Sequence, residues 1–178
     1  MTADDTPESP DSNKGPNGGG GEAAQQTPQQ APPLAINGQY IKDLSFEVPG
    51  APGIFGDMQK NAPSINVNVN VDGKQFQEKL YEVVLSIRAE CSVGENVGFI
   101  LELAYAGLFT LNVPSEQTQF FLLVECPRHL FPFARNVVCD VTRDGGFPPM
   151  MLDPIDFVAM LQNSMKEAAA KSDADSEA

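Results

Sequence analysis

The segment Ile65-Asn-Val-Asn-Val-Asn-Val71 constrains the fold more than any other part of the 178-residue chain, because apolar and polar residues alternate in it without a break. In a β-strand, successive side chains point to opposite faces, so the apolar residues share one face and the asparagines share the other. A helix would spread the same residues around its whole circumference. The segment therefore predicts a strand in a sheet with one buried and one solvated face.

Three further segments show the same period of two and supply partners for that strand. They cover residues 40–48, 81–93 and 97–111, and the residues between the last two are typical of a tight hairpin turn. In the first segment we place Tyr40, Leu44, Phe46 and Val48 on the apolar face, opposite Ile41, Asp43, Ser45 and Glu47. Short connections favour antiparallel pairing, so the sequence predicts a four-stranded antiparallel sheet with one apolar and one acidic face.

After Pro114 the period changes to that of helices. Ser115 is expected to cap the first helix, and Pro127 to kink or restart it, because proline has no amide hydrogen to donate. Gly145-Gly146 is expected to end the helical run, and Asp153-Pro154 to begin a last helix. Strands come first and helices second. The predicted fold class is therefore α+β, a four-stranded antiparallel sheet with the C-terminal helices packed on one face.

Composition divides the chain into three parts. Residues 1–36 are rich in glycine, proline and glutamine and offer little that a core could bury, so we expect a disordered N-terminal extension. Residues 37–168 are expected to form the folded domain. Residues 169–178 are expected to form an acidic, flexible C-terminal tail.

Charge and cysteine usage limit the partners and the compartment. The chain has 24 acidic and 11 basic side chains and a net charge of −13, which excludes nucleic acid and anionic membrane as partners and permits a basic protein. The N-terminus does not resemble a secretory signal, and no apolar stretch approaches the roughly 18 residues of a membrane span. Three cysteines without a CxxC pair fit a reducing compartment, so we expect a cytoplasmic protein without membrane insertion.

The side chains give little support to an enzyme or a metal site. His129 is the only histidine, and although Cys126 lies three residues before it, no second pair of ligands completes a tetrahedral zinc site. The glycine run at residues 18–21 lacks the lysine and hydroxyl of a phosphate loop. We therefore expect no catalytic residue, no metal and no cofactor. A small hydrolase that uses Cys126 or Cys139 with His129 is the minor alternative.

Two surfaces of the predicted sheet have more than one interpretation. Asp43 and Glu47 point to the same face of one strand, and Glu102 lies on another strand. A solvated face explains these charges, and so does a docking surface for a basic partner. The large apolar residues of segment 97–111 and of the irregular segments either pack in the core, form an oligomer interface or line a groove for extended chain.

Several segments, in the same order, resemble the SecB family of bacterial export chaperones. They are Lys42-Asp-Leu-Ser-Phe-Glu-Val-Pro-Gly-Ala-Pro52, Leu80-Tyr-Glu-Val-Val-Leu85, Cys126-Pro-Arg-His-Leu-Phe-Pro-Phe-Ala-Arg135, and Asp144-Gly-Gly-Phe-Pro-Pro149 leading to Asp153-Pro-Ile-Asp-Phe157. The resemblance covers roughly residues 39–165 and leaves the N-terminal extension outside it. It implies that residues 37–168 form a SecB-like chaperone domain.

The resemblance also implies a function and a set of partners. A SecB-like chaperone is an ATP-independent holdase that binds unfolded precursor proteins, keeps them competent for translocation and delivers them to the SecA motor. It is a homotetramer, a dimer of dimers, and it docks the basic C-terminal tail of SecA, whose zinc belongs to SecA. Carried over by motif, the docking residues are Asp43, Glu47, Ile100 and Glu102. Leu101, Leu103 and Tyr105 match the alternate face, which takes part in subunit association.

Family members bind extended substrate in apolar grooves beside the helices. The candidate groove residues are Ile54, Phe55, Met58, Phe131 and Phe133. Familiar members have a tryptophan in the loop that holds the first three, whereas this chain has no tryptophan, and the flexible thioether of Met58 is the candidate substitute. The alternative to a holdase is a non-enzymatic oligomeric adaptor or structural module that does not bind unfolded chains in general.

Overall fold

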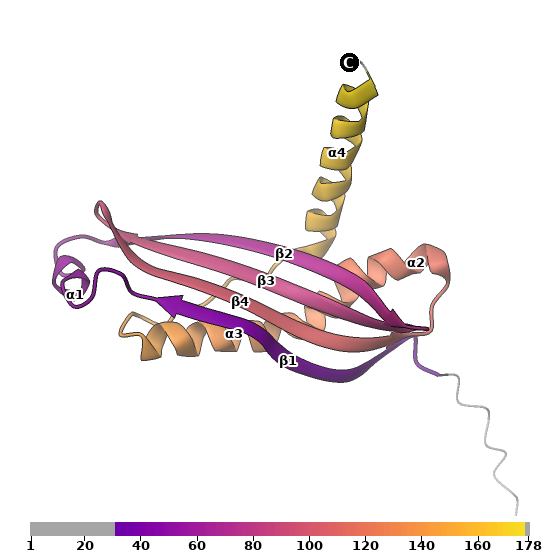
Figure 1. The fold of residues 1–178 in the computed structure, drawn as a ribbon, viewed down its shortest axis with the longest axis horizontal. Coiled ribbons are helices and arrows are strands. Elements are labelled where there is room, and N and C mark those ends of the chain that lie inside the picture. Colours follow the sequence, from indigo (N-terminus) through magenta and orange to yellow (C-terminus); the bar gives the residue numbers. More distant parts are fainter. Residues whose placement is uncertain (1–30, 177–178) are drawn as a thin grey trace, which may run out of the picture. The chain divides into compact units, whose positions relative to one another are not determined.

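Four long strands form one antiparallel sheet in the computed structural model, which describes residues 31–176 and the side chains of residues 31–169. The strands are β1 (Leu34–Glu47), β2 (Pro63–Gln77), β3 (Leu80–Val93) and β4 (Asn96–Leu111), in the spatial order β1-β4-β3-β2 (Figure 1). Each of the four predicted strands is present. β3 and β4 each begin one residue before their alternating patterns, β2 extends beyond Ile65–Val71 at both ends, and β1 begins six residues before Tyr40 and ends one residue before Val48. The predicted α+β fold, an antiparallel sheet with helices on one face, is confirmed.

Cross-strand pairing divides the sheet into a helix side and an open side. On β3, and on β4 from Phe99 onward, the odd-numbered residues face the helices, and most are almost fully buried, as Leu85 at 0% and Phe99 at 1% exposure illustrate. The even-numbered residues of β3 face the open side and include Glu82, Arg88 and Glu90. One apolar and one charged face are therefore present, as the alternation predicts.

The prediction for the faces of β1 is wrong in its first half because the strand has a bulge at Lys42. Ile41 pairs with Tyr105 and Asp43 with Ala104, so one residue of β1 has no partner on β4. An extra residue reverses the alternation, since two residues of one strand then oppose one of the other. Tyr40 consequently shares the open side with Asp43, and Ile41 shares the helix side with Leu44 and Phe46.

The helices follow the sheet in sequence, apart from the short α1 (Ile54–Asp57) between β1 and β2. They are α2 (Ser115–Phe120), the π-helical segment η1 (Phe121–Glu125), α3 (Cys126–Asp144) and α4 (Phe157–Ser176). Helical structure continues without a gap through Pro127, but it changes type there: the π-helical η1 ends at Glu125, and α3 starts at Cys126 with Pro127 in its first turn. A π-helical turn widens the backbone just before the proline, where a regular α-helix would bring its ring against a carbonyl.

The outer boundaries of the fold also differ from the predicted ones. The last helix begins at Phe157, three residues later than Pro154 implies, because Asp156 caps it: its carboxylate accepts a hydrogen bond from the Ala159 amide at 3.0 Å. At the other end, β1 begins at Leu34, which pairs with Leu111. Strand structure thus reaches into the segment assigned to the N-terminal extension, whose residues 1–30 lie outside the described part of the chain.

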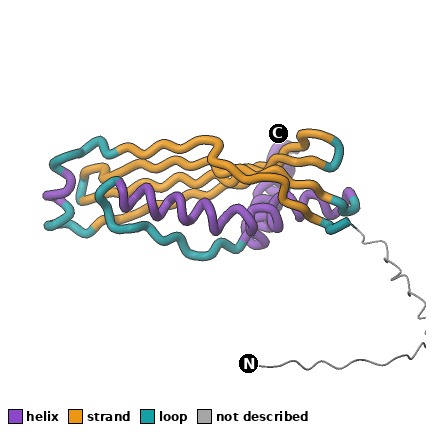
Figure 2. Tube along the Cα trace, turned by 90° about the horizontal axis from the view of Figure 1, so that it is seen from below, coloured by secondary structure: helices purple, strands orange, loops and turns teal. Residues whose placement is uncertain are grey.

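The helix α3 lies along the sheet and supplies the second layer of the core (Figure 2). At its end, Gly145 and Gly146 bring two aromatic rings against the backbone. A Cβ atom on Gly145 would lie 2.2 Å from Cε1 of Phe46, and Gly146 has a φ of +85° with Phe55 beside it. Phe99 and Phe147 complete this aromatic cluster, with ring centroids 5.0 Å apart. The glycine pair therefore ends the helix and also allows the cluster to form.

Replacing Gly145 by alanine is expected to lower the free energy of unfolding by about 1–3 kcal/mol, because the added methyl group overpacks the ring of Phe46. Urea denaturation followed by circular dichroism measures this loss. Gly56→Ala is the matched control, since nothing lies within 4 Å of its Cβ position. An unchanged midpoint for Gly145→Ala would contradict the packing described here.

Candidate functional site

Three successive rows of side chains on the open side bring the predicted docking residues together. The rows run from β1 across β4 to β3: Asp43–Ala104–Ser86, Ser45–Glu102–Arg88 and Glu47–Ile100–Glu90. Same-face neighbours along a strand lie about 7 Å apart. The four predicted residues Asp43, Glu47, Ile100 and Glu102 therefore lie on two adjacent strands of one surface. We call the nine residues of these rows the docking patch.

The acidic side chains of the open side differ in whether they already have a basic partner. Arg88 forms an ion pair with Glu102, and its second terminal nitrogen lies 3.8 Å from Glu90. Lys42 binds Glu82 at 2.7 Å. Within residues 31–169, no ion pair or side-chain hydrogen bond involves Asp43 or Glu47. These two carboxylates are thus available to a partner.

Beside the docking patch, Tyr40 donates a hydrogen bond to Glu82. This bond raises the pKa of Tyr40 to about 12, because ionisation of the phenol would place two negative charges together. The ammonium of Lys42 and the Tyr40 hydroxyl both lower the pKa of Glu82. Sequence reasoning missed this cluster, since the bulge at Lys42 brings Tyr40 onto the open side. It also missed Arg88, although the period of two places Arg88 on the same face as Glu82 and Glu90.

The five predicted groove residues do not form one group. Ile54, the first residue of α1, is buried at 1% exposure, and Phe55 packs on Phe147 with ring centroids 5.6 Å apart. Phe131 contacts Phe157 of α4, whereas Phe133 stacks on Tyr105 of β4 with ring centroids 6.4 Å apart. Phe131 and Phe133 point to different sides of α3 because they are two residues apart on a helix. The structure therefore separates the loop candidates from the helix candidates.

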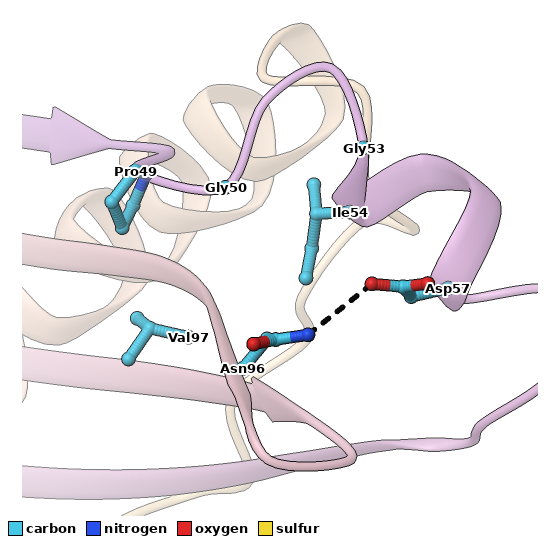
Figure 3. Close-up of a pocket in the computed structure, with 7 residues that line it drawn as sticks. All are labelled: Pro49, Gly50, Gly53, Ile54, Asp57, Asn96 and Val97. Atoms are coloured by element: carbon cyan, nitrogen blue, oxygen red, sulfur yellow. Dashed lines mark hydrogen bonds between the residues drawn. The ribbon is translucent and has the colours of Figure 1, made fainter.

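An open pocket of about 400 Å³ lies between the loop before α1 and the start of β4 (Figure 3). The side chains of Ile54 and Val97 form an apolar wall of this pocket, and Gly50 and Gly53, which also line it, have no side chains that would fill it. The amide of Asn96 donates a hydrogen bond to the Asp57 carboxylate at 3.3 Å, which ties α1 to the β3–β4 hairpin. Met58, the proposed substitute for tryptophan, is half-buried beyond α1 and does not line this pocket.

The three residues predicted to take part in subunit association lie in the core of the single chain. Leu101, Leu103 and Tyr105 have exposed fractions of 0%, 2% and 8%. They face the helix side, where α3 covers β4, and have almost no surface left for another subunit. Other apolar residues beside them remain exposed, namely Ile36, Ile41 and Leu44 of β1 and Phe133 of α3, which we call the β1 strip.

Cys126 and His129, the first pair of the hydrolase alternative, do not form a catalytic pair. Cys126 is fully buried, whereas His129 is exposed. Burial raises the pKa of the Cys126 thiol to about 12, so the nucleophilic thiolate does not form near neutral pH. Among residues 31–176, no group of three or more histidine, cysteine, aspartate or glutamate side chains is arranged to hold a metal ion. In the same part of the chain, no helix has the length and apolar character needed to cross a membrane.

Comparison with known proteins decides the family. The family model of the preprotein translocase subunit SecB matches residues 27–168. The chain belongs to the SecB family. The protein-export protein SecB of Paramagnetospirillum magneticum is 52% identical over 147 residues, which are 82% of this chain and 95% of that relative. That of Granulibacter bethesdensis is 54% identical over 144 residues, which are 76% of this chain and 84% of that relative.

The SecB family is a family of protein-export chaperones, and this chain is a chaperone of that kind. A solved SecB-like chaperone of Mycobacterium tuberculosis, in complex with a peptide from an antitoxin, has the same fold. Its TM-score is 0.59 at 15% identity, and the match covers 69% of this chain and 91% of that chain. The antiparallel sheet with helices on one side is therefore the SecB fold.

Proposed function

We propose that the protein is an ATP-independent holdase that binds unfolded precursor proteins, keeps them competent for translocation and delivers them to SecA. The observation that carries this proposal is an apolar row on β2 that the helices leave partly uncovered. Ile65 and Val67 are 45% and 39% exposed on the helix side, where buried side chains are expected in a closed fold. An exposed apolar row on a soluble domain is typical of a binding surface.

The row continues into a small apolar hollow between β2 and the helices. Val69 and Val71 line one side of this hollow and Leu123, Met160 and Leu161 the other, around a volume of about 120 Å³. Met160 and the exposed Met165 of α4 add flexible thioethers, which adapt to varied client side chains. We propose that β2, α4 and the Phe55 end of the sheet contact the client in place of a single groove.

The backbone of β2 offers contacts that do not depend on client sequence. Within residues 31–176 it pairs only with β3, without a register shift from Pro63 to Gln75, so its other edge has no strand partner in that part of the chain. The segment from Ile65 to Val71 has no charged residue to block strand pairing, whereas the free edge of β1 is interrupted by two bulges. An extended client segment fits the β2 edge because its own backbone donors and acceptors are unpaired.

This mode of binding requires no nucleotide. Burying apolar client surface contributes on the order of 25 cal/mol per Å², and binding to the unfolded form alone opposes folding by mass action. We propose that the protein acts as a homotetramer, in which several weak sites engage one client and strengthen its binding by avidity. The docking patch is proposed to bind the basic, zinc-bearing tail of SecA through Asp43 and Glu47.

Calorimetric titration with one precursor in its unfolded and folded forms tests the holdase proposal. We expect heat of binding with the unfolded form alone, and a loss of about tenfold in affinity for Val67→Lys, because a lysine on the apolar row must be desolvated by the client. The matched control is Asn68→Lys, which puts the same charge on the open side of the same strand. Equal or absent binding of both forms would favour the adaptor alternative.

A further inference from the structure

Arg88 lies at the edge of a hollow on the open side of the sheet. The hollow has a volume of about 270 Å³, with the short side chains of Ser86 and Ala104 in its floor. Asp43 of β1 and Asn68 of β2 stand on opposite sides, and Arg88 and Glu102 line it together. The hollow therefore overlaps the docking patch. Its lining includes Glu102, which is paired with Arg88, and Asp43, which has no ion-pair partner within residues 31–169.

Arg88 occupies the place that a cation from a partner would take. Its guanidinium pairs with Glu102, which lies directly across from it on β4, and reaches towards Glu90 two residues along β3. A lysine or arginine that enters the hollow between Asp43 and Glu102 meets this guanidinium first. Like charges at such short range repel, so the incoming cation binds both carboxylates only after Arg88 moves away.

The Arg88–Glu102 pair is weak enough to be opened. The two side chains are 50% and 48% exposed, and an exposed ion pair changes an equilibrium constant by at most about fivefold because water and salt screen it. Arg88 is also free to turn towards Glu90, so displacement does not leave it without an acidic neighbour. The pair thus reduces the affinity for basic ligands without blocking the site.

We propose that Arg88 is an internal competitor of the docking partner, which binds Glu102 in the free protein and is displaced when a basic peptide segment occupies the hollow. The proposal rests on the proposed docking function of the same surface and adds a residue that regulates it. A ligand with a single cation gains only the contact to Asp43. A segment with several closely spaced cations engages Asp43 and Glu47 and also displaces Arg88, so the competitor favours highly basic partners.

The test measures docking of the zinc-loaded SecA tail, and of a lysine-rich synthetic peptide without metal ligands, to the full chain and its variants by calorimetry at low salt. Arg88→Gln is expected to tighten docking by up to about fivefold, the factor that corresponds to the upper end of the range for an exposed ion pair. The control is Lys74→Gln. It removes the same charge from the open side, three rows further along the sheet opposite Glu82, and is expected to change the affinity by less than about twofold.

Nuclear magnetic resonance of the Arg88 Nε–H group gives a second measurement. Addition of the basic peptide to the wild-type protein is expected to shift this resonance as the guanidinium leaves Glu102. Equal tightening by Arg88→Gln and Lys74→Gln, or an unshifted Arg88 resonance in the bound state, would overturn the proposal while leaving docking intact. If neither basic ligand binds the wild type or Arg88→Gln, the proposed docking function is wrong, and the role proposed for Arg88 is wrong as well. Unchanged client binding verifies that each variant is folded.

Discussion

Replacing Asp43 and Glu47 together by lysine is expected to abolish docking of the SecA tail, with a loss of affinity of at least about 100-fold. These are the two carboxylates of the docking patch that have no basic partner within residues 31–169. The substitutions remove both and put two cations beside Arg88, so that a basic ligand meets repulsion where the wild type attracts it. Calorimetric or surface-plasmon titration with the zinc-loaded tail measures the loss.

The fold and client binding are expected to survive this double substitution. Neither side chain packs in the core, and both are exposed on the side of the sheet away from the helices. The matched control is Glu78→Lys with Glu116→Lys, which makes the same change of net charge at a turn and in the first turn of α2. Docking that survives in Asp43→Lys with Glu47→Lys would show that the acidic face is only solvated. Equal loss in the control would show an effect of net charge alone.

The sheet could be predicted from the sequence because the alternation of apolar and polar residues that specifies each strand lies within that strand. A period of two specifies which residues of β3 and β4 are buried, and the structure agrees from Tyr81 to Val93. The bulge at Lys42 could not be predicted in the same way. One inserted residue changes the faces of the residues before it, here back to the second bulge between Ile36 and Gly38, and both Tyr40 and Ile41 are apolar enough to fit either side. Only pairing with β4 decides between them.

The proposed client-binding surface is harder to predict, because it depends on which residues the helices leave uncovered. Phe131, Phe133 and Phe55 are similar in sequence terms, yet each packs against a different element. The Ile65–Val71 alternation predicts a buried row, but the layer formed by α3 covers β3 and β4 and does not extend over Ile65 and Val67. Likewise, the sequence pattern around Leu101 and Leu103 predicts that they are buried, but it does not specify whether a helix of the same chain or a second subunit covers them. Burial by distant elements is not encoded in local periodicity.

Replacing Phe133 by aspartate is expected to reduce the proposed tetramer to a smaller species. The β1 strip is the apolar surface beside α3 that the single chain leaves open, with Ile41 at 47% and Phe133 at 52% exposure. Phe133 stacks on Tyr105, whose cross-strand neighbour is Ile41, so these side chains form one continuous surface. In a symmetric interface each residue occurs once in each subunit, so one substitution puts two carboxylates into the same buried contact. The free energy needed to desolvate these two carboxylates exceeds the stabilisation that a subunit interface of ordinary size provides.

Native mass spectrometry at several protein concentrations measures this change, and Ile41→Asp is expected to act in the same direction. The matched control is Phe76→Asp, an equally large apolar loss on β2, where the ring is 66% exposed and lies outside the β1 strip. The control is expected to keep the mass of the wild type. A tetramer that persists in both Phe133→Asp and Ile41→Asp would exclude the β1 strip as the interface. A mass that falls only in Phe76→Asp would move the interface to β2 and make that edge unavailable to clients.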